Sequence, residues 1–367
     1  MAGHEAMSHP AFSPGTVDPA ELDARTFGRA ALLKRLTDRI VSSAQDGSRP
    51  HTLLVAPRGT GKTHTLQVAI HRALKQRKPA KATLLLALPE DSLAIGSYPD
   101  LLVELLRTQG PEVHERAREL RGDALELERE ILDLAAGRMV LIAIENADRI
   151  FDAIGEAGQG SFRAWVETST AVLVFATAPA LFPAVSSRTH PWYGSFIIEE
   201  LPDLTEADVA ELLAQHAHSR ELASYVETSE GHAKIGEVAQ IVGWAPRVWQ
   251  IIAETVDRAA LASVTPAADA VLEQLTPHYQ QLLWQLPTGE QRLIVELARA
   301  DGPRTVTDLA AAVGISNQSA SAALGRLTTG GWVHAAKADS GDRRATWYDL
   351  SDPLLRNYLH YRERRQR

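Results

Sequence analysis

An eight-residue turn early in the chain constrains the fold more than any other feature of the sequence. It reads Ala-Pro-Arg-Gly-Thr-Gly-Lys-Thr over residues 56–63, follows an apolar run at residues 52–55 and opens an amphipathic stretch at residues 63–75. Glycines allow backbone conformations that other residues resist, so several N–H groups can face one anion at the start of a helix. Strand, turn and helix signals occur together, so the segment predicts a phosphate-binding loop rather than a chance glycine-rich turn.

The side chains of this turn have separate predicted tasks. Gly59 and Gly61 let the backbone face the β- and γ-phosphates of a nucleotide. Lys62 supplies a cation, and Thr63 offers a hydroxyl ligand to Mg²⁺. The pattern usually begins with glycine, and Ala56 stands there, which alters the entry to the loop but removes neither group. We therefore expect ATP or ADP with Mg²⁺ as cofactors. The remaining predicted nucleotide-binding residues of the turn are Pro57, Arg58, Thr60 and His64.

A second motif, about 80 residues downstream, is an apolar run that ends in an acid. It reads Val-Leu-Ile-Ala-Ile-Glu-Asn-Ala-Asp over residues 140–148, and Glu145 is the predicted carboxylate on the Mg²⁺ side. Hydrolytic ATPases usually need a second carboxylate to orient the attacking water, but Asn146 follows and Asp148 comes two residues later. Asparagine can align water without accepting its proton. We expect either slow turnover, with help from Asp148, or none. The alternative for Asp148 itself is the N-cap of a helix.

The spacing of apolar blocks predicts the fold class. Blocks at residues 52–55, 83–88, 140–144, 171–176 and 196–198 alternate with amphipathic stretches at 63–75, 98–108 and 112–136. Parallel strands require such helical crossovers, so the pattern predicts an α/β fold of the P-loop type, with a doubly wound parallel sheet of about five strands. After residue 201 only helical patterns continue. Thr205 is the expected N-cap of a helix at residues 206–216, and another helix runs from Pro246 to about Leu261.

With these motifs in place, residues 27–261 resemble the AAA+ and STAND ATPases, especially the branch of origin-recognition-type initiators. Residues 26–36 look like the Gly-Arg-Glu box of that family, with Ala30 in place of the glutamate. The resemblance implies that Gly28 and Arg29 lie near the nucleotide. A surface position at the start of a helix is the alternative for Arg29.

The same resemblance implies three further site elements. Thr177 matches the polar residue that senses the γ-phosphate, with a simple strand-end hydroxyl as the alternative. Arg188 matches an arginine finger that reaches the nucleotide of a neighbouring subunit, which implies a homo-oligomer, and a solvent-facing loop residue is its alternative. Pro246 and Arg247 match a G-x-P-R element that approaches the nucleotide from the lid, or they only start a helix.

Residues 305–350 carry a second resemblance, to winged helix-turn-helix domains of the MarR type. A helix closed by Gly314 precedes a second helix at residues 316–329 and two short strands joined by a wing. The second helix has one basic residue, so the domain either binds DNA or packs on the nucleotide-binding domain as a latch. The predicted DNA-binding residues are Asn317, Gln318, Ser319, Ser321, Arg326, Arg343 and Arg344.

Composition excludes several classes of protein. The 367 residues include no cysteine, which removes disulfides, thiolate zinc sites and thiol nucleophiles. Apolar runs fall far short of the about 18 residues of a membrane span, and the N-terminus does not resemble a secretion signal, so we expect a cytoplasmic protein. The net charge is −8, yet the last twelve residues contain five arginines and one glutamate, which either bind phosphates or keep a helix end soluble.

Together these features predict five segments and one principal function. The segments are a flexible leader (1–24), a nucleotide-binding core (25–200), a helical lid (201–262), a linker (263–278) and a winged helix-turn-helix domain with a basic tail (279–367). The principal hypothesis is an ATP-binding switch whose nucleotide state controls DNA binding or self-assembly. One alternative is a winged-helix transcription regulator with a structural nucleotide. Another is an assembly ATPase that coats DNA and recruits a protein effector in transposition, plasmid maintenance or phage defence.

Overall fold

The computed structural model describes residues 17–57, 59–88, 92, 95–300, 302–336 and 346–366. The chain divides into two compact units, an N-terminal unit that ends at Pro202 and a C-terminal unit that begins at Asp203. No helix among these described residues is long and apolar enough to cross a membrane.

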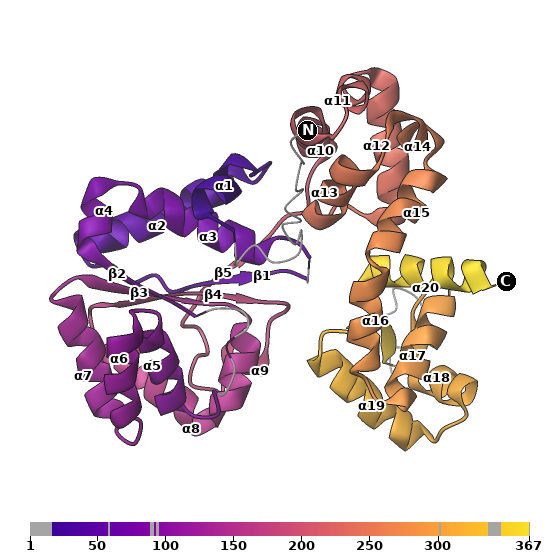
Figure 1. Ribbon diagram of the computed structural model, residues 1–367. Helices are drawn as coiled ribbons and strands as arrows, with labels where there is room; N and C mark the ends of the chain where they lie inside the picture. The colour runs from indigo at the N-terminus through magenta and orange to yellow at the C-terminus, as the bar shows by residue number, and fades with distance from the viewer. Residues whose placement is uncertain are drawn as a thin grey trace. The chain divides into compact units, whose positions relative to one another are not determined.

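The N-terminal unit is built on a five-stranded parallel sheet in the order β2-β3-β4-β1-β5. Helices α1 to α4 lie on one face of the sheet and α5 to α8 on the other (Figure 1). The predicted doubly wound parallel sheet is therefore confirmed, with strand bounds close to the apolar blocks. The strands are β1 (Thr52–Val55), β2 (Thr83–Leu88), β3 (Met139–Ile144), β4 (Val172–Ala178) and β5 (Ile197–Glu200).

The helices of this unit correct two predictions. The stretch at residues 112–136 is two helices, because Asp123 accepts hydrogen bonds from the N–H groups of Leu125 and Glu126 and so starts a new helix. Part of the expected leader is structured, since α1 buries Leu22, while residues 1–16 lie outside the described residues. The helices are α1 (Pro19–Ala24), α2 (Ala30–Asp46), α3 (Lys62–Leu74), α4 (Arg77–Ala82), α5 (Tyr98–Arg107), α6 (Pro111–Glu119), α7 (Ala124–Ala135), α8 (Ala147–Thr168) and α9 (Pro183–Ser186).

The sheet carries an apolar core on each face. Leu141 and Phe175 belong to the cluster under α2 and α3, whereas Ile142 and Val174 belong to the cluster under α5 and α8. Burial on both faces explains why the strands read as continuous apolar runs instead of alternating patterns.

The C-terminal unit is helical except for a three-stranded antiparallel sheet in the order β6-β8-β7. Thr205 caps α10 as expected, and Gly314 ends α18 in the left-handed conformation that favours glycine. The elements are α10 (Glu206–His216), α11 (Arg220–Val226), α12 (Ser229–Val242), α13 (Pro246–Thr255), α14 (Arg258–Ser263), α15 (Thr265–Gln274), α16 (Thr276–Trp284), α17 (Thr288–Arg299), β6 (Arg304–Thr305), α18 (Val306–Val313), α19 (Asn317–Thr329), β7 (Val333–Ala336), β8 (Trp347–Leu350) and α20 (Pro353–Gln366).

The segment at residues 263–278, expected as a linker, is helical. It forms α15 and the start of α16, and it buries Ala267, Val271 and Leu272. Its serine, threonine, proline and alanine content resembles a linker, but Pro266 and Pro277 each stand in the first turn of a helix, where proline is tolerated.

The basic end of the chain belongs to this helical packing. On α20, Arg364 pairs with Asp269 and Arg365 pairs with Glu273, at 3.0 Å each. These two arginines pair with acids of α15, a role that differs from both expected ones, phosphate binding and the solubility of a helix end.

His51 marks a site where burial couples stability to pH. Its Nδ1 accepts a hydrogen bond from the N–H of Val174 at 3.1 Å, and its ring lies edge-on to Trp192 and Phe196. Burial, with the positive charges of Arg163 and Arg49, lowers the pKa of His51 from 6.5 to about 4. A proton on Nδ1 would also oppose the Val174 donor, so the folded state holds the neutral ring.

We predict that the N-terminal unit loses stability as pH falls from about 6.5 to about 4. In that window the unfolded chain binds a proton at His51 and the folded chain does not, so the free energy of unfolding falls with pH, by on the order of 3 kcal/mol. His51→Asn keeps an acceptor but cannot titrate, so it should remove the His51 share of the dependence, while His64, whose pKa is also lowered to about 4, keeps its own. Thermal melts of both proteins at several pH values would check this, and equal pH slopes would contradict it.

Candidate nucleotide-binding site

The carboxyl ends of three neighbouring strands meet at one edge of the sheet. The phosphate loop follows β1, Glu145 follows β3, and Thr177 lies near the end of β4. The register pairs Leu54 with Thr177 and Ile144 with Ala176, which places the three segments side by side. Parallel α/β sheets bind ligands at this edge.

The backbone of the loop has the shape expected for an anion site. Gly59 and Gly61 have φ of 80° and 87°, in the left-handed region that favours glycine. Gly61 starts α3 without a side-chain cap, so the first N–H groups of the helix are available to a phosphate. Thr60 Oγ1 donates to the carbonyl of Pro57 at 2.7 Å and braces the turn. Arg58 lies outside the described residues.

Lys62 lies inside the curve of the loop. Its ammonium group donates to the carbonyls of Ala56 at 2.6 Å and Pro57 at 2.9 Å, and the residue is only 8% exposed. Ala56 therefore takes part through its backbone, which explains why the missing first glycine leaves the cation in place. A bound phosphate would compete with these carbonyls for the ammonium hydrogens.

Thr63 and Glu145 are in direct contact, with the Thr63 hydroxyl donating to Glu145 Oε2. Glu145 is 8% exposed. A hydroxyl and a carboxylate so close together can bind one Mg²⁺, which in nucleotide sites completes its shell with water and phosphate oxygens. Within the described ranges no three His, Asp or Glu side chains form a metal-binding group, so a cation here would depend on such outside ligands. The residues present thus fit a Mg²⁺-nucleotide.

Asn146 holds a backbone conformation that few residues tolerate. Its φ and ψ are 49° and 52°, and asparagine is among the side chains that enter this region most readily. Its N–H donates to Thr177 Oγ1 at 3.1 Å, which fixes the loop after β3 to the buried end of β4. Asn146 occupies the N-cap position of α8, and Asp148 lies in the first turn, so the alternative that Asp148 is the cap is wrong.

Gly28 and Arg29 lie beside the phosphate loop. Both have positive φ, 60° and 57°. Arg29 Nη1 donates to the carbonyl of Thr60 at 2.7 Å, and its Nε donates to the carbonyl of Pro202 at 2.9 Å. Arg29 therefore ties the loop to the last residue of the N-terminal unit, and it is more than a solvent-facing helix start. No local sequence signal identifies Pro202 as its partner.

His64 packs against the segment that precedes α2. Its Nε2 lies 2.8 Å from Thr26 Oγ1, and that hydroxyl donates its one proton to the carbonyl of Leu22. His64 is therefore the donor to Thr26. Burial, with the charge of Arg29, lowers the pKa of His64 to about 4, so the ring is neutral near pH 7.

The remaining predicted nucleotide-sensing residues are Arg188, in the N-terminal unit, and Pro246 and Arg247, in the C-terminal unit. Arg188 is exposed in the turn after α9 and makes no ion pair or hydrogen bond with the residues that the structure describes. Pro246 is the first residue of α13. Arg247 follows it, and its Nη1 lies 3.2 Å from His278 Nε2 within the C-terminal unit. Burial lowers the pKa of Arg247 to about 10, which leaves it charged.

The predicted DNA-binding residues have mixed positions. Asn317, Gln318, Ser319 and Ser321 are exposed on α19. Arg326 instead pairs with the buried Glu290 of α17, with Nε and Oε1 2.7 Å apart. Sequence reasoning missed Glu290, because its burial depends on how α17 and α19 pack. Arg343 and Arg344 lie outside the described residues.

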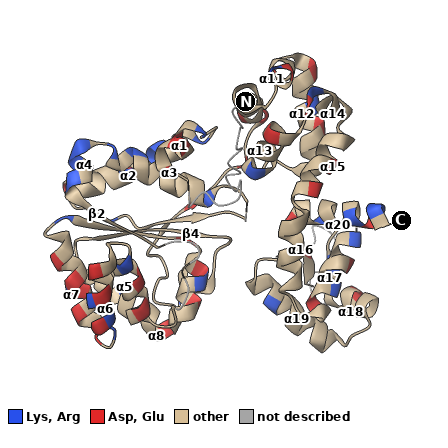
Figure 2. Cartoon of the chain, in the orientation of Figure 1, with Lys and Arg blue, Asp and Glu red and all other residues tan. Residues whose placement is uncertain are grey.

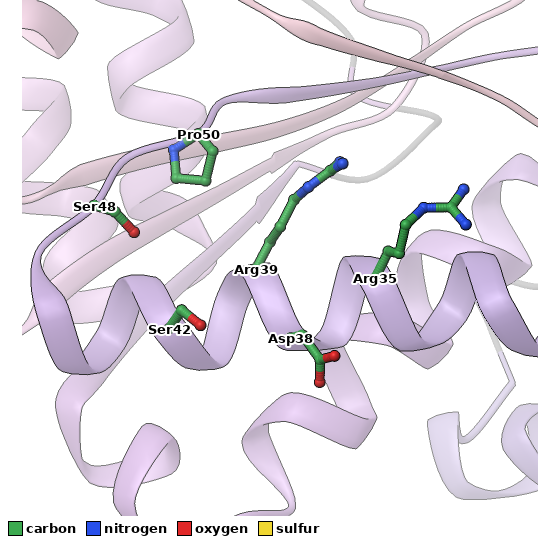
Figure 3. Close-up of a pocket in the computed structure, with 6 residues that line it drawn as sticks. All are labelled: Arg35, Asp38, Arg39, Ser42, Ser48 and Pro50. Atoms are coloured by element: carbon green, nitrogen blue, oxygen red, sulfur yellow. The ribbon is translucent and has the colours of Figure 1, made fainter.

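A separate shallow depression lies along α2, away from the phosphate loop (Figure 3). Both of its arginines, Arg35 and Arg39, bond the carboxylate of Glu199 on β5. These ion pairs lower the pKa of Glu199 against the opposing effect of burial. One carboxylate thus serves both arginines of the depression. Its lining residues are Arg35, Asp38, Arg39, Ser42, Ser48 and Pro50.

Comparison with known proteins finds one family model that matches part of the chain and solved structures that are similar over most of it. Residues 284–345 match the model of the MarR family. A Walker-type ATPase of Pyrococcus abyssi is similar over 91% of this chain and 96% of its own, with 16% identity and a TM-score of 0.61. Comparison with curated protein sequences finds no match.

Two ORC proteins of Aeropyrum pernix are also similar in structure. The ORC2 protein of Aeropyrum pernix, solved as ADPNP-ADP complexes, covers 98% of this chain and 99% of its own at 12% identity, with a TM-score of 0.59. The ORC1 protein of the same organism, solved in complex with DNA, covers 92% and 94% at 12% identity, with a TM-score of 0.53.

The chain therefore has the fold of the Walker-type and ORC-like AAA+ ATPases. Its residues 284–345 form a MarR-family winged-helix domain. Both resemblances drawn from the sequence are confirmed at the level of fold.

We predict that Thr63→Val and Glu145→Gln each remove the contribution of Mg²⁺ to ATP binding. Each loses one cation ligand, so ATP affinity should fall roughly 10-fold or more with Mg²⁺ and little when EDTA is present. Calorimetric titration with and without Mg²⁺ would measure this. Glu156→Gln, at an exposed position of α8, is the matched control. An undiminished Mg²⁺ effect in both variants would show that these residues hold no cation.

We predict that Arg326→Ala destabilises the winged helix, by about 1–3 kcal/mol, because it leaves the buried Glu290 carboxylate without its partner. Adding Glu290→Gln should recover most of the loss. Chemical unfolding of the wild type, the single variant and the double variant would measure both effects. A single variant as stable as wild type would mean that the ion pair contributes nothing to the fold.

Proposed function

We propose that this protein binds ATP or ADP with Mg²⁺ and that the bound nucleotide controls DNA binding by its winged-helix domain. The observation that carries the nucleotide part is the Thr63–Glu145 contact beside Lys62 at the start of α3. A MarR-family domain in the same chain supports the DNA part, as does the structural similarity to an ORC1 protein solved with DNA.

Separate groups of the site would bind the phosphates, hold Mg²⁺ and align water. The N–H groups at the start of α3 and the Lys62 ammonium bind the phosphates, while Thr63 and Glu145 hold Mg²⁺. The metal ion, when bound, neutralises charge that develops on the phosphates. The backbone N–H of Asn146 donates to Thr177, and its side-chain amide can align a water molecule but cannot accept a proton. Hydrolysis is accordingly slow in this proposal, with Asp148 as the next acid after Asn146 along the chain.

Two sets of contacts support a route from nucleotide to DNA. Arg29 bonds both Thr60 of the phosphate loop and Pro202, so a change at the loop reaches the point where the second unit begins. Within the C-terminal unit, Tyr279 Oη donates to Asp352 Oδ2 at 2.7 Å, and α20 packs on α12 and α15. A reorientation of the lid helices would therefore carry the winged helix with it.

Self-assembly is the second candidate, and one observation favours it. Arg188 is exposed and lacks an ion-pair partner among the described residues, as an arginine finger would in a single copy. In this form of the proposal the nucleotide of one copy binds Arg188 of the next, and a protein effector recognises the assembly. The regulator with a structural nucleotide differs from both, since its DNA affinity would not depend on the nucleotide.

We predict that affinity for a random-sequence duplex differs at least about 5-fold between the ADP state and the state with a slowly hydrolysed ATP analogue. Fluorescence anisotropy would give the affinity and light scattering the mass of each complex. Lys62→Ala should abolish the nucleotide effect, because it removes a phosphate contact. Lys34→Ala, an exposed cation of α2, is the matched control and should keep the effect.

The outcomes separate the candidates. Growth of the particle only with the ATP analogue, lost in Arg188→Ala, would select the assembly form. Nucleotide-dependent DNA binding at constant mass would select the switch. Equal affinity and mass in all nucleotide states would overturn the proposal and favour a regulator with a structural nucleotide.

A further inference from the structure

The N-terminal unit carries a cluster of exposed cations that the nucleotide site does not use. Lys75 follows the last turn of α3, and Arg77, Lys78 and Lys81 lie on the short helix α4. All four residues are exposed. We call these four residues the α4 basic patch.

The local structure turns these side chains outward. Pro79 is the buried residue of α4, so the face of the helix that carries Pro79 packs inward. The cations lie on the exposed surface of the helix. Arg77 and Lys81 are four residues apart, and Lys78 and Lys81 are three apart, so like charges are neighbours on the helix. Each such pair costs a few tenths of a kcal/mol, so the cluster is maintained at a small cost to stability.

No acid neutralises the patch within the part of the chain that the structure describes. None of its four side chains forms an ion pair or hydrogen bond there, and residues 71–88 contain no Asp or Glu. The arginines of α6 and α7 differ, since Arg116, Arg118 and Arg129 all pair with glutamates. Figure 2 shows the contrast, with blue residues gathered at α4 and many red residues on α6 and α7 across the sheet.

Helix α19, which carries the predicted base-reading residues, has little charge of its own for phosphates, although Arg292, Arg304 and Arg362 elsewhere in the C-terminal unit are exposed. Arg326, the one basic residue of α19, is held by Glu290, and the other predicted contacts on that helix are uncharged. DNA affinity depends strongly on cations that release counterions from the phosphate backbone. A DNA-binding chain with net charge −8 therefore needs a local source of positive charge, and the α4 basic patch is one.

We infer that the α4 basic patch binds the phosphate backbone of duplex DNA, as a contact independent of sequence and separate from α19. The inference rests on the proposed DNA binding and assigns part of it to the ATPase unit. The acidic side of a second copy is the competing partner, and the mass of the protein without DNA distinguishes the two.

The test compares two quadruple variants of the full-length chain. The patch variant is Lys75→Gln, Arg77→Gln, Lys78→Gln and Lys81→Gln. The control removes the same number of positive charges from the opposite side of the unit, with Arg116→Gln, Arg118→Gln, Arg121→Gln and Arg129→Gln, all more than half exposed. Retained ATP binding shows that each variant folds. Lys78→Gln with Lys81→Gln replaces the patch variant if four changes prevent folding.

The measurement is the affinity for random-sequence duplexes across a range of salt concentrations. Each phosphate contact contributes roughly 0.9 to the slope of log affinity against log salt, so the patch variant should lose up to about 3.6 of the slope. The double variant should lose up to about 1.8. The loss should be similar for duplexes of different sequence, because the contact carries no base readout. The control should keep the wild-type slope.

Several results would overturn the inference. An unchanged slope in a folded patch variant would do so and leave the proposed function intact if binding still responds to nucleotide. An equal loss in both quadruple variants would point to net charge alone. A patch variant that lowers the mass of the protein without DNA, and leaves the slope unchanged, would make the patch a contact between copies. Wild-type protein that binds no DNA in any nucleotide state would remove the proposed function and the inference together.

Discussion

The contact between Thr63 and Glu145 joins residues that are 82 positions apart, and the N-terminal unit is arranged so that they meet. β4 lies between β1 and β3, so the contact requires both strand pairs to be parallel and in register. Parallel pairing in turn requires each connection to cross the sheet as a helix. The contact between this hydroxyl and this carboxylate thus depends on the helices that connect the strands and cover both faces of the sheet.

Two residues with strained backbone conformations lie at the same edge of the sheet. Non-glycine residues rarely adopt positive φ, yet Arg29 and Asn146 both do so beside the phosphate loop and after β3. Each conformation is fixed by a hydrogen bond to another segment, from Arg29 to Thr60 and from Asn146 to Thr177. Such strain persists only where the surroundings determine it. Two of the four described non-glycine residues with positive φ thus lie at this edge, and the other two, Ala136 and Val264, stand at helix ends.

The sequence predicts the elements with local signals and misses those that depend on packing. The strands, the Thr205 cap and the Gly314 helix end follow from runs of apolar residues and from cap chemistry, and all are found. The helices at residues 263–278 were hidden because their composition resembles a linker, and only burial of Val271 and its neighbours shows otherwise. Likewise the partners of Arg29 and Arg326 lie 173 and 36 residues away, beyond any local pattern.

If the proposed DNA contacts hold, the two units divide the tasks of affinity and discrimination in a way that their charges explain. On α19 the exposed side chains are uncharged apart from Arg326, which pairs with Glu290, so they can read bases only at close range. Long-range attraction to DNA requires cations that are not already paired. If those cations lie on the unit that also binds nucleotide, affinity and discrimination reside on different units. A nucleotide that moves one unit relative to the other would then change DNA affinity even if the base contacts of α19 stayed the same. The phosphate contacts and the base contacts could no longer be made to one duplex at the same time.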